Sequence, residues 1–232
     1  MPLFNTAEPI IRRKQHALDF QDRQGLLNLK LQISNRTLFH NVYTRIDQVF
    51  VVWGLITALI FFTAQFAPID WRIQAGFWSV LTVAGTTAMS VLTYFWVKVE
   101  RLRWVLYAWI VLMLGGIVIT DYGIFWGSAT ILMHLCYIWL GLSAVGYFCT
   151  GIGLRSRAFM MAGSFHLLGI VILPLCIGWQ FMATGLVMTA NLLMFAETQW
   201  DMRLPIDNYD VLSEEQKKFN REQFLVRQAE SL

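Results

Sequence analysis

Long apolar runs, separated by short polar turns, occupy the chain from Val49 to Ala196. Several of them reach the ~17 to 25 residues that a helix needs to cross a hydrocarbon core about 30 Å thick. The whole chain of 232 residues is 56% hydrophobic and only 14% charged, whereas about a quarter of the residues in soluble domains are charged. The sequence therefore predicts an all-α, multi-pass membrane domain with a polar tail at each end.

These runs predict six transmembrane helices. A polar break at residues 121–123 ends the third run, and the fourth run is longer than the bilayer requires, so its helix is either tilted or begins near Ala129. The membrane domain covers residues 49–199, between a segment of residues 1–48 and a tail of residues 200–232. The predicted spans are residues 49–66, 75–97, 104–120, a part of 124–150, 158–175 and 177–196.

Basic residues predict the orientation, because Lys and Arg are retained on the cytoplasmic side of a membrane. With the N-terminus inside, this side holds seven basic residues of the N-terminal segment, three of residues 98–103, two of residues 151–157 and five of the C-terminal tail. Only Arg72 is left outside. We expect both ends of the chain in the cytoplasm, and the protein in the cell inner membrane or in an internal membrane such as the thylakoid.

Both tails contain patterns typical of secondary structure. Apolar residues of the segment 27–33 alternate with polar residues, which indicates a short half-buried strand or extended segment. Another set, Leu26, Leu27, Leu31 and Leu38, would suit one face of a helix on the membrane surface. Ser213 and Gln216 have the spacing of a capping box before a charged helix of about residues 214–228. This short helix would be available to a soluble cytoplasmic partner.

The ten tryptophans divide into two groups. Seven lie near the ends of the predicted spans, where an amphipathic ring prefers the headgroup level. The other three, Trp53, Trp109 and Trp139, lie deeper, so we expect them to pack between helices.

Polar side chains form stripes on two of the predicted spans. At 100° per residue, the hydroxyls of the second span fall within an arc of about 80° and cover ~21 Å, and polar residues of the sixth span share about 40°. Such stripes face the interior of a bundle, because lipid offers them no partners. They either allow close helix packing or line the path of a small neutral solute. The residues are Ser79, Thr82, Thr86, Ser90 and Thr93 in the second span and Gln180, Thr184 and Asn191 in the sixth.

Two histidines, His134 and His166, lie inside apolar runs. An ionisable side chain within a membrane indicates a functional site, and Tyr137 is close to His134 on the same helix. Counted from the turn between their helices, the histidines differ in height by ~12 Å, so they do not suit the two axial positions of one haem. Each alone could ligate the metal of a tetrapyrrole, either chlorophyll or haem. The alternative is a neutral histidine hydrogen-bonded to the next helix.

Catalytic motifs are absent from the sequence. It contains no P-loop, no G-x-S-x-G and no His-x-x-x-His, and no carboxylate lies in the middle of a span, where coupled transporters place one. An enzyme is therefore the class with the least support, and nothing indicates binding of nucleic acid.

Uncharged spans, short turns and two tails on one side favour an accessory or assembly subunit, which would bind other membrane-protein subunits, a lipid or a pigment. Two alternatives remain open. One is a channel or transporter for a small neutral solute, and the other is a tetrapyrrole-binding membrane protein that uses a single histidine.

Overall fold

The computed structural model describes residues 4, 9–14, 17–33, 36–203 and 211–230, with the side chains of residues 31–40 and 228–230 outside this description. Six long helices dominate it. They are α2 (Arg45–Phe66), α3 (Trp71–Val99), α4 (Arg103–Phe125), α5 (Ala129–Leu154), α6 (Arg157–Ile172), which a 3-10 turn, η1 (Leu173–Leu175), extends, and α7 (Gln180–Glu197).

Five of these helices, α2 to α6, are long and apolar enough to cross a membrane. The described chain is therefore that of a mainly α-helical, multi-pass membrane protein. The helix α7 is not among the five. It has 18 residues, and Gln180, Asn191 and Glu197 lower its hydropathy. Of the six predicted spans, five thus have the length and composition of a membrane helix.

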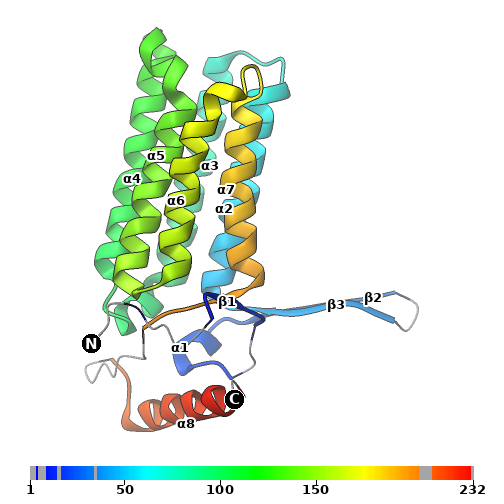
Figure 1. The fold of residues 1–232 in the computed structure, drawn as a ribbon, viewed down its shortest axis with the longest axis vertical. Coiled ribbons are helices and arrows are strands. Elements are labelled where there is room, and N and C mark those ends of the chain that lie inside the picture. Colours follow the sequence, from blue (N-terminus) through cyan, green and yellow to red (C-terminus); the bar gives the residue numbers. More distant parts are fainter. Residues whose placement is uncertain (1–3, 5–8, 15–16, 34–35, 204–210, 231–232) are drawn as a thin grey trace.

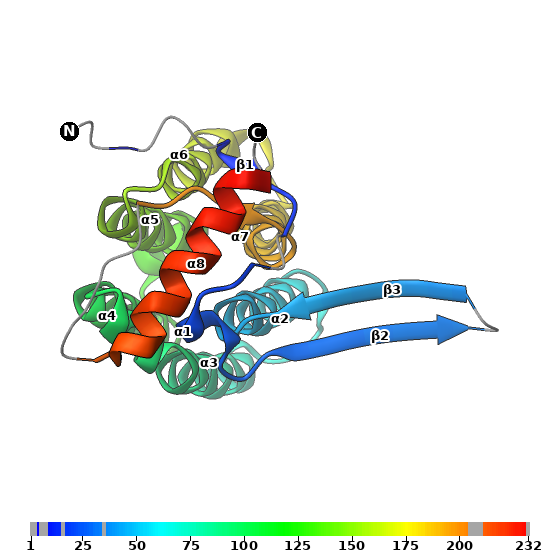
Figure 2. The same cartoon turned by 90° about the horizontal axis from the view of Figure 1, so that it is seen from below.

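The six long helices stand side by side and form a ring (Figures 1 and 2). Neighbours in the ring follow chain order from α2 to α6, and α7 closes it by packing along α2 and, more sparsely, against α5 and α6. The helices turn apolar side chains outward. For example, Leu55 of α2, Val111 of α4 and Leu186 of α7 are 64%, 69% and 61% exposed. So much exposed hydrocarbon suits a surface that contacts lipid.

Local contacts explain where α2 begins and why α4 continues beyond the predicted end of its span. At the start of α2, the Asp47 amide donates to Thr44 Oγ1 at 3.2 Å and the Thr44 amide donates to the Asp47 carboxylate at 2.8 Å, which is a capping box. The predicted break at residues 121–123 is wrong, because α4 continues to Phe125. Asp121 is satisfied inside the bundle, where Ser79 Oγ of α3 donates to its carboxylate at 3.0 Å.

Elements of both tails gather at one end of the ring, which we call the base. The helices α1 (Phe20–Arg23) and α8 (Glu214–Glu230) lie across this end (Figure 2). Beside them, β1 (Ile11–Arg12) pairs antiparallel with β4 (Gln199–Trp200). The α3–α4 and α5–α6 turns are at the base as well, so residues distant in the sequence meet there (Figure 1).

The patterns in the two tails correspond to regular elements. The alternating segment is strand β2 (Leu27–Ile33), which pairs antiparallel with β3 (Arg36–Tyr43), so the alternative of a surface helix is wrong. This hairpin projects sideways from the base (Figures 1 and 2). The predicted capping pair is present at α8, where the Ser213 amide donates to Gln216 Oε1 at 3.0 Å and the Gln216 amide donates to Ser213 Oγ at 3.3 Å.

Candidate ligand-binding cavity

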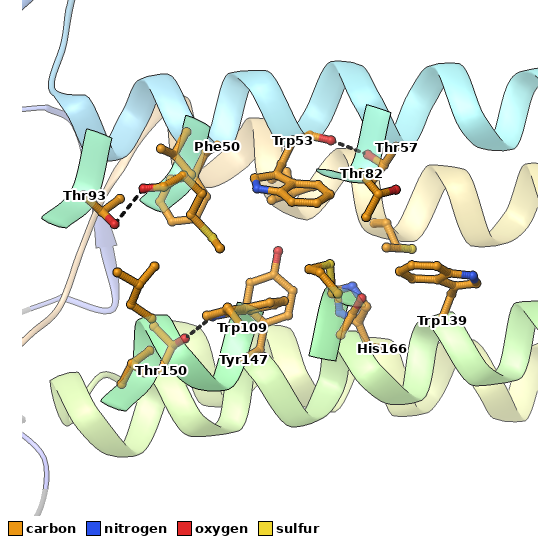
Figure 3. A pocket seen from close by; sticks show the side chains of 18 of the residues that line it. Phe50, Trp53, Thr57, Thr82, Thr93, Trp109, Trp139, Tyr147, Thr150 and His166 are labelled. Carbon is orange, nitrogen blue, oxygen red and sulfur yellow. Dashed lines mark hydrogen bonds between the residues drawn. The ribbon is translucent and has the colours of Figure 1, made fainter. Parts of the chain in front are cut away.

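The ring encloses a cavity of about 160 Å³. Side chains from all six long helices line it, from Ile46 and Trp200 near the base to Phe61 and Trp78 toward the opposite end. The wall is mainly apolar and aromatic (Figure 3). Small-molecule sites in proteins have this character, with a few placed polar groups in an apolar concave surface.

The three tryptophans that the sequence places deep in the membrane all line this cavity. Two of them are fixed by hydrogen bonds between α4 and α5. Trp109 Nε1 donates to Thr150 Oγ1 at 2.9 Å, and Trp139 Nε1 donates to Thr120 Oγ1 at 3.1 Å. Because their only polar atoms are paired, these two rings present apolar surface to the cavity.

Three other polar atoms of cavity-lining residues are unpaired. His166 of α6 is fully buried, and its Nδ1 lies 2.8 Å from the carbonyl oxygen of Ala162. In the part of the chain that the structure describes, His166 Nε2, Trp53 Nε1 and Trp200 Nε1 have no hydrogen-bond partner. A buried polar group without a partner costs roughly 1–3 kcal/mol. Packed side chains surround all three atoms, so the cavity is a candidate binding site through its volume and its apolar wall.

Tyr147 of α5 belongs to the same part of the wall. Its ring centroid is 4.8 Å from that of His166, and its hydroxyl points into the cavity (Figure 3). No motif in the sequence points to this residue. Its position in the middle of a predicted span, where the hydroxyl is far from headgroup water, is the one feature of the sequence that could have indicated a role in a polar site.

The two predicted histidine sites lie on different surfaces. His134 is exposed on the outside of the ring, with its Nδ1 2.7 Å from the carbonyl oxygen of Thr130. Tyr137 is its neighbour, with ring centroids 5.6 Å apart. The structure therefore brings His166 to the cavity and leaves His134 and Tyr137 away from it.

The hydroxyl stripe of α3 reaches the cavity in part. Ser79, Thr82 and Thr93 line it, whereas Thr86 and Ser90 do not. Each hydroxyl of the stripe except that of Ser79 donates to the carbonyl oxygen four residues earlier, at 2.7–2.8 Å. Such back-bonding satisfies the hydroxyl within its own helix, so the stripe adds little free hydrogen-bonding capacity to the wall.

The polar stripe of α7 lies elsewhere. None of the cavity-lining residues in the described chain comes from it. Thr184 is fully buried and Gln180 half-buried, while Asn191 Nδ2 donates to the carbonyl oxygen of Val187 at 2.8 Å. The structure therefore does not bring the two predicted stripes together around one space.

The cavity has no room for a tetrapyrrole. A protein cavity of about 150 Å³ holds one benzene molecule, whereas a macrocycle contains four pyrrole rings. His166 is enclosed on all sides, so no macrocycle can reach its Nε2 in this arrangement of the helices, and one bound to His134 would lie outside the ring. Among the described residues, no group of three or more His, Cys, Asp or Glu side chains is arranged to hold a metal ion.

Asp201 follows the cavity-lining Trp200 at the base. It is buried, and it caps α6 by accepting hydrogen bonds from the backbone amides of Arg157 and Ala158 at 3.0 Å and from Arg157 Nε at 2.8 Å. A carboxylate at a helix N-terminus also interacts favourably with the helix dipole. Because Trp200 is the residue next to Asp201, this cap holds the indole at the bottom of the cavity.

A second buried carboxylate connects the ring to the tails. Glu100, which follows α3, accepts a hydrogen bond from Gln21 Nε2 of α1 at 3.1 Å, and its other oxygen is 3.8 Å from Arg203 Nη2. Gln21 in turn accepts from Asn220 Nδ2 of α8 at 3.0 Å. Burial raises the pKa of Glu100 to about 7, although Arg203 opposes the shift.

The pKa of Asp22, in α1, is raised as well. Burial, together with the nearby carboxylates of Asp19 and Glu100, raises the pKa of Asp22 to about 7. Trp96 Nε1 donates to its Oδ1 at 2.9 Å and, like Arg227, limits the shift. The base therefore contains two carboxyl groups that hold their protons up to neutral pH.

These features define a class: a multi-pass helical membrane protein with an apolar, ligand-sized cavity enclosed by its helices. Comparisons with models of protein families, with curated proteins and with solved structures found no match to the chain.

The contact of α1 and α8 with the ring should weaken as the pH rises from 5 to 8. Folded pKa values near 7 for Asp22 and Glu100 exceed the ordinary values of 3.8 and 4.5, so the docked base holds protons that the detached state releases. This contribution to stability is full below about pH 4 and is lost as the pH rises through 7. Hydrogen exchange in α1 and α8, corrected for the intrinsic effect of pH, should show greater protection at pH 5.

Glu100→Gln, which keeps the group neutral at every pH, should reduce this difference. Glu222→Gln, at an exposed position of α8, is the matched control and should leave it unchanged. Equal protection at both pH values in the unaltered protein would contradict the prediction.

Proposed function

We propose that this chain is an accessory membrane protein that holds an apolar molecule, or the apolar part of a lipid, inside its helix ring. The observation that carries the proposal is a cavity of about 160 Å³ with a mainly apolar and aromatic wall, to which all six long helices contribute. An apolar wall favours hydrocarbon through the hydrophobic effect, and a few polar groups fix the orientation of the ligand. The volume suits a one-ring compound or a short section of chain.

The cavity wall supports this function better than it supports transport of a small neutral solute. A polar solute needs a continuous series of free donors and acceptors along its path. The hydroxyls of Thr82 and Thr93 are bonded to their own helix, and the indole N–H groups of Trp109 and Trp139 are bonded to threonines. The wall therefore offers few free polar contacts to a solute.

The proposal includes six membrane spans, with α7 as the sixth and with both ends of the chain in the cytoplasm. At ~1.5 Å per residue, the 18 residues of α7 extend for ~27 Å, close to the thickness of a hydrocarbon core. It runs beside α2, and Leu186 on its outer side is 61% exposed. Basic residues of the α3–α4 turn, the α5–α6 turn and α8 are at the base, whereas Arg72 follows the turn at the opposite end. This asymmetry supports a cytoplasmic base.

Reporter fusions should test this topology. A reporter that fluoresces only in the cytoplasm should be active when fused after Leu232 and inactive when fused after Gly178, because α7 would then be missing. Fluorescence from both fusions would contradict a sixth span, and fluorescence from the shorter fusion alone would reverse the orientation.

The accessory role is supported by the β2–β3 hairpin. Its exposed side chains include Leu27 and Leu29, which are 47% and 45% exposed. The hairpin is fixed where it meets the ring, because Asn41 Nδ2 and Tyr43 Oη donate to the carboxylate of Glu197 at 2.9 and 2.6 Å. A fixed projection with exposed leucines suits another membrane-protein subunit beside the ring.

A combined Leu27→Ser and Leu29→Ser variant should release this partner. In a mild-detergent extract of the native membrane, the unaltered protein should migrate in a complex of higher mass and the variant as free protein. Leu225→Ser, at a 62% exposed position of α8, is the control and should keep the complex. If the unaltered protein itself migrates as free protein, this result contradicts the accessory role.

Filling the cavity should abolish the binding of an apolar probe. Ser143 of α5 is buried and lines the cavity, so Ser143→Leu places additional hydrocarbon in it. Ser164→Leu makes the same change on the exposed side of α6. p-Xylene should raise the melting temperature of the unaltered protein and of Ser164→Leu, because a ligand of the folded state stabilises it. It should not raise that of Ser143→Leu.

Equal shifts in the two variants would locate the effect of p-xylene outside the cavity. The absence of any shift in the unaltered protein would contradict a site for apolar ligands.

A further inference from the structure

The α3–α4 and α5–α6 turns at the base share an unusual backbone conformation. Arg101 and Arg155 are the described residues other than glycine that have a positive φ, 55° and 52°. In each turn, the amide that follows the arginine donates to the carbonyl oxygen five residues earlier, at 2.7 and 2.9 Å, which is the bond of a Schellman motif. Glycine usually occupies the position of these arginines, because it has no side chain to oppose a positive φ. Each turn therefore keeps an arginine where the backbone favours glycine.

These two turns are in contact with each other. A Cβ atom on Gly153, at the end of α5, would be 3.1 Å from Cζ2 of Trp104, at the start of α4. Arg203 joins the turns, because its Nη1 donates to the carbonyl oxygen of Gly153 at 2.8 Å and its Nη2 donates to that of Glu100. Burial lowers the pKa of Arg203, and the charge of nearby Arg155 lowers it further, against the effect of Glu100. The arginines of both turns therefore belong to one small region of the base.

Three arginines of this region, Arg101, Arg103 and Arg155, have exposed side chains. Within the described part of the chain, none of the three side chains makes a hydrogen bond or an ion pair. Arg157 has the same place in the second turn as Arg103 has in the first, but its Nε is 2.8 Å from the carboxylate of Asp201. We call the three exposed residues the arginine cluster. Their like charges repel one another, so an anion that contacts them all is favoured.

The arginine cluster lies at the edge of the apolar outer surface of the ring. Trp104, the residue after Arg103, is 46% exposed, and Ile152, three residues before Arg155, is 58% exposed. Exposed apolar side chains suit contact with lipid tails, and a tryptophan ring prefers the headgroup level. Both turns are at the end of the helix ring, beside the elements of the tails (Figure 1). The three guanidinium groups are therefore at the level of lipid phosphates.

We infer that the arginine cluster binds the headgroup of an anionic phospholipid, whose acyl chains lie along the apolar surface of α4 and α5. A guanidinium pairs with phosphate oxygens through two parallel hydrogen bonds. Basic pockets between membrane helices on the cytoplasmic side bind anionic headgroups in the same way. Arginine in place of the favoured glycine at two positions supports a role for these side chains. The inference concerns the outer surface of the ring and does not depend on the ligand cavity.

Two lipids with identical acyl chains separate the headgroup from the hydrocarbon. Phosphatidylglycerol is anionic, whereas phosphatidylcholine carries a phosphate in a headgroup with no net charge. Their affinities for the purified full chain in a neutral detergent can be measured by native mass spectrometry. Acyl chains that enter the cavity or lie on the helices contribute equally to both affinities. The unaltered protein should prefer phosphatidylglycerol, and added salt should reduce this preference by screening the charges.

Arg103→Gln should reduce the preference by about fivefold, the contribution of one basic residue near an anionic lipid surface. A combined Arg101→Gly and Arg155→Gly variant should reduce it by more than about tenfold. The same variant should keep or raise its melting temperature in neutral detergent without lipid, because glycine adopts a positive φ without strain. Its loss of preference would therefore not result from unfolding. Arg72→Gln, at an exposed position of the opposite end, is the control and should leave the preference unchanged.

Three results would overturn the inference. The first is equal affinity of the unaltered protein for the two lipids. The second is a preference that survives in the glycine variant, or that Arg72→Gln reduces as much as Arg103→Gln does, because the attraction would then be a property of the net charge. The third uses inorganic phosphate as the probe. If it raises the melting temperature of the lipid-free protein as much as phosphatidylglycerol does, and Arg103→Gln removes this effect, the cluster binds a free anion and not a lipid.

Discussion

Polar groups inside a bilayer must find their hydrogen-bond partners within the protein, because lipid tails offer none. Most polar side chains of the helix ring meet this requirement. Thr82, Thr86 and Thr93 donate to their own helix, Trp109 and Trp139 bond to threonines of the neighbouring helix, and Asp121 accepts from Ser79. These bonds hold neighbouring helices together while the space between them stays apolar.

The exceptions among the described residues that line the cavity are Trp53 Nε1, His166 Nε2 and Trp200 Nε1, which have no hydrogen-bond partner. The ring has six helices and no helix at its centre, and its side chains form both a buried apolar core and a cavity. At the base, Asp201 caps α6, and the adjacent Trp200 lines the cavity. The proposed function follows from this apolar cavity, to which every long helix contributes.

The sequence predicted the helices and strands of this fold much better than it predicted the contacts between them. Apolar runs located five membrane-type helices and α7 to within a few residues, and the spacing of Ser213 and Gln216 located α8. Helical arithmetic assigns residues to faces of one helix, but it does not say which face meets a neighbour, so it could not tell exposed His134 from buried His166. Trp53, Tyr147 and His166 come from three helices and line one cavity only because the ring packs them around it. The small residues around His166, Ala162 and Gly163, were the one local sign of close packing.

The most direct test of the ligand-binding account is a high-resolution structure of the protein extracted gently from its native membrane, with the cavity as the region of interest. The account predicts continuous density for an elongated or one-ring apolar molecule within the cavity. A cavity that holds only separate water molecules, or one closed by side chains in other rotamers, would contradict it.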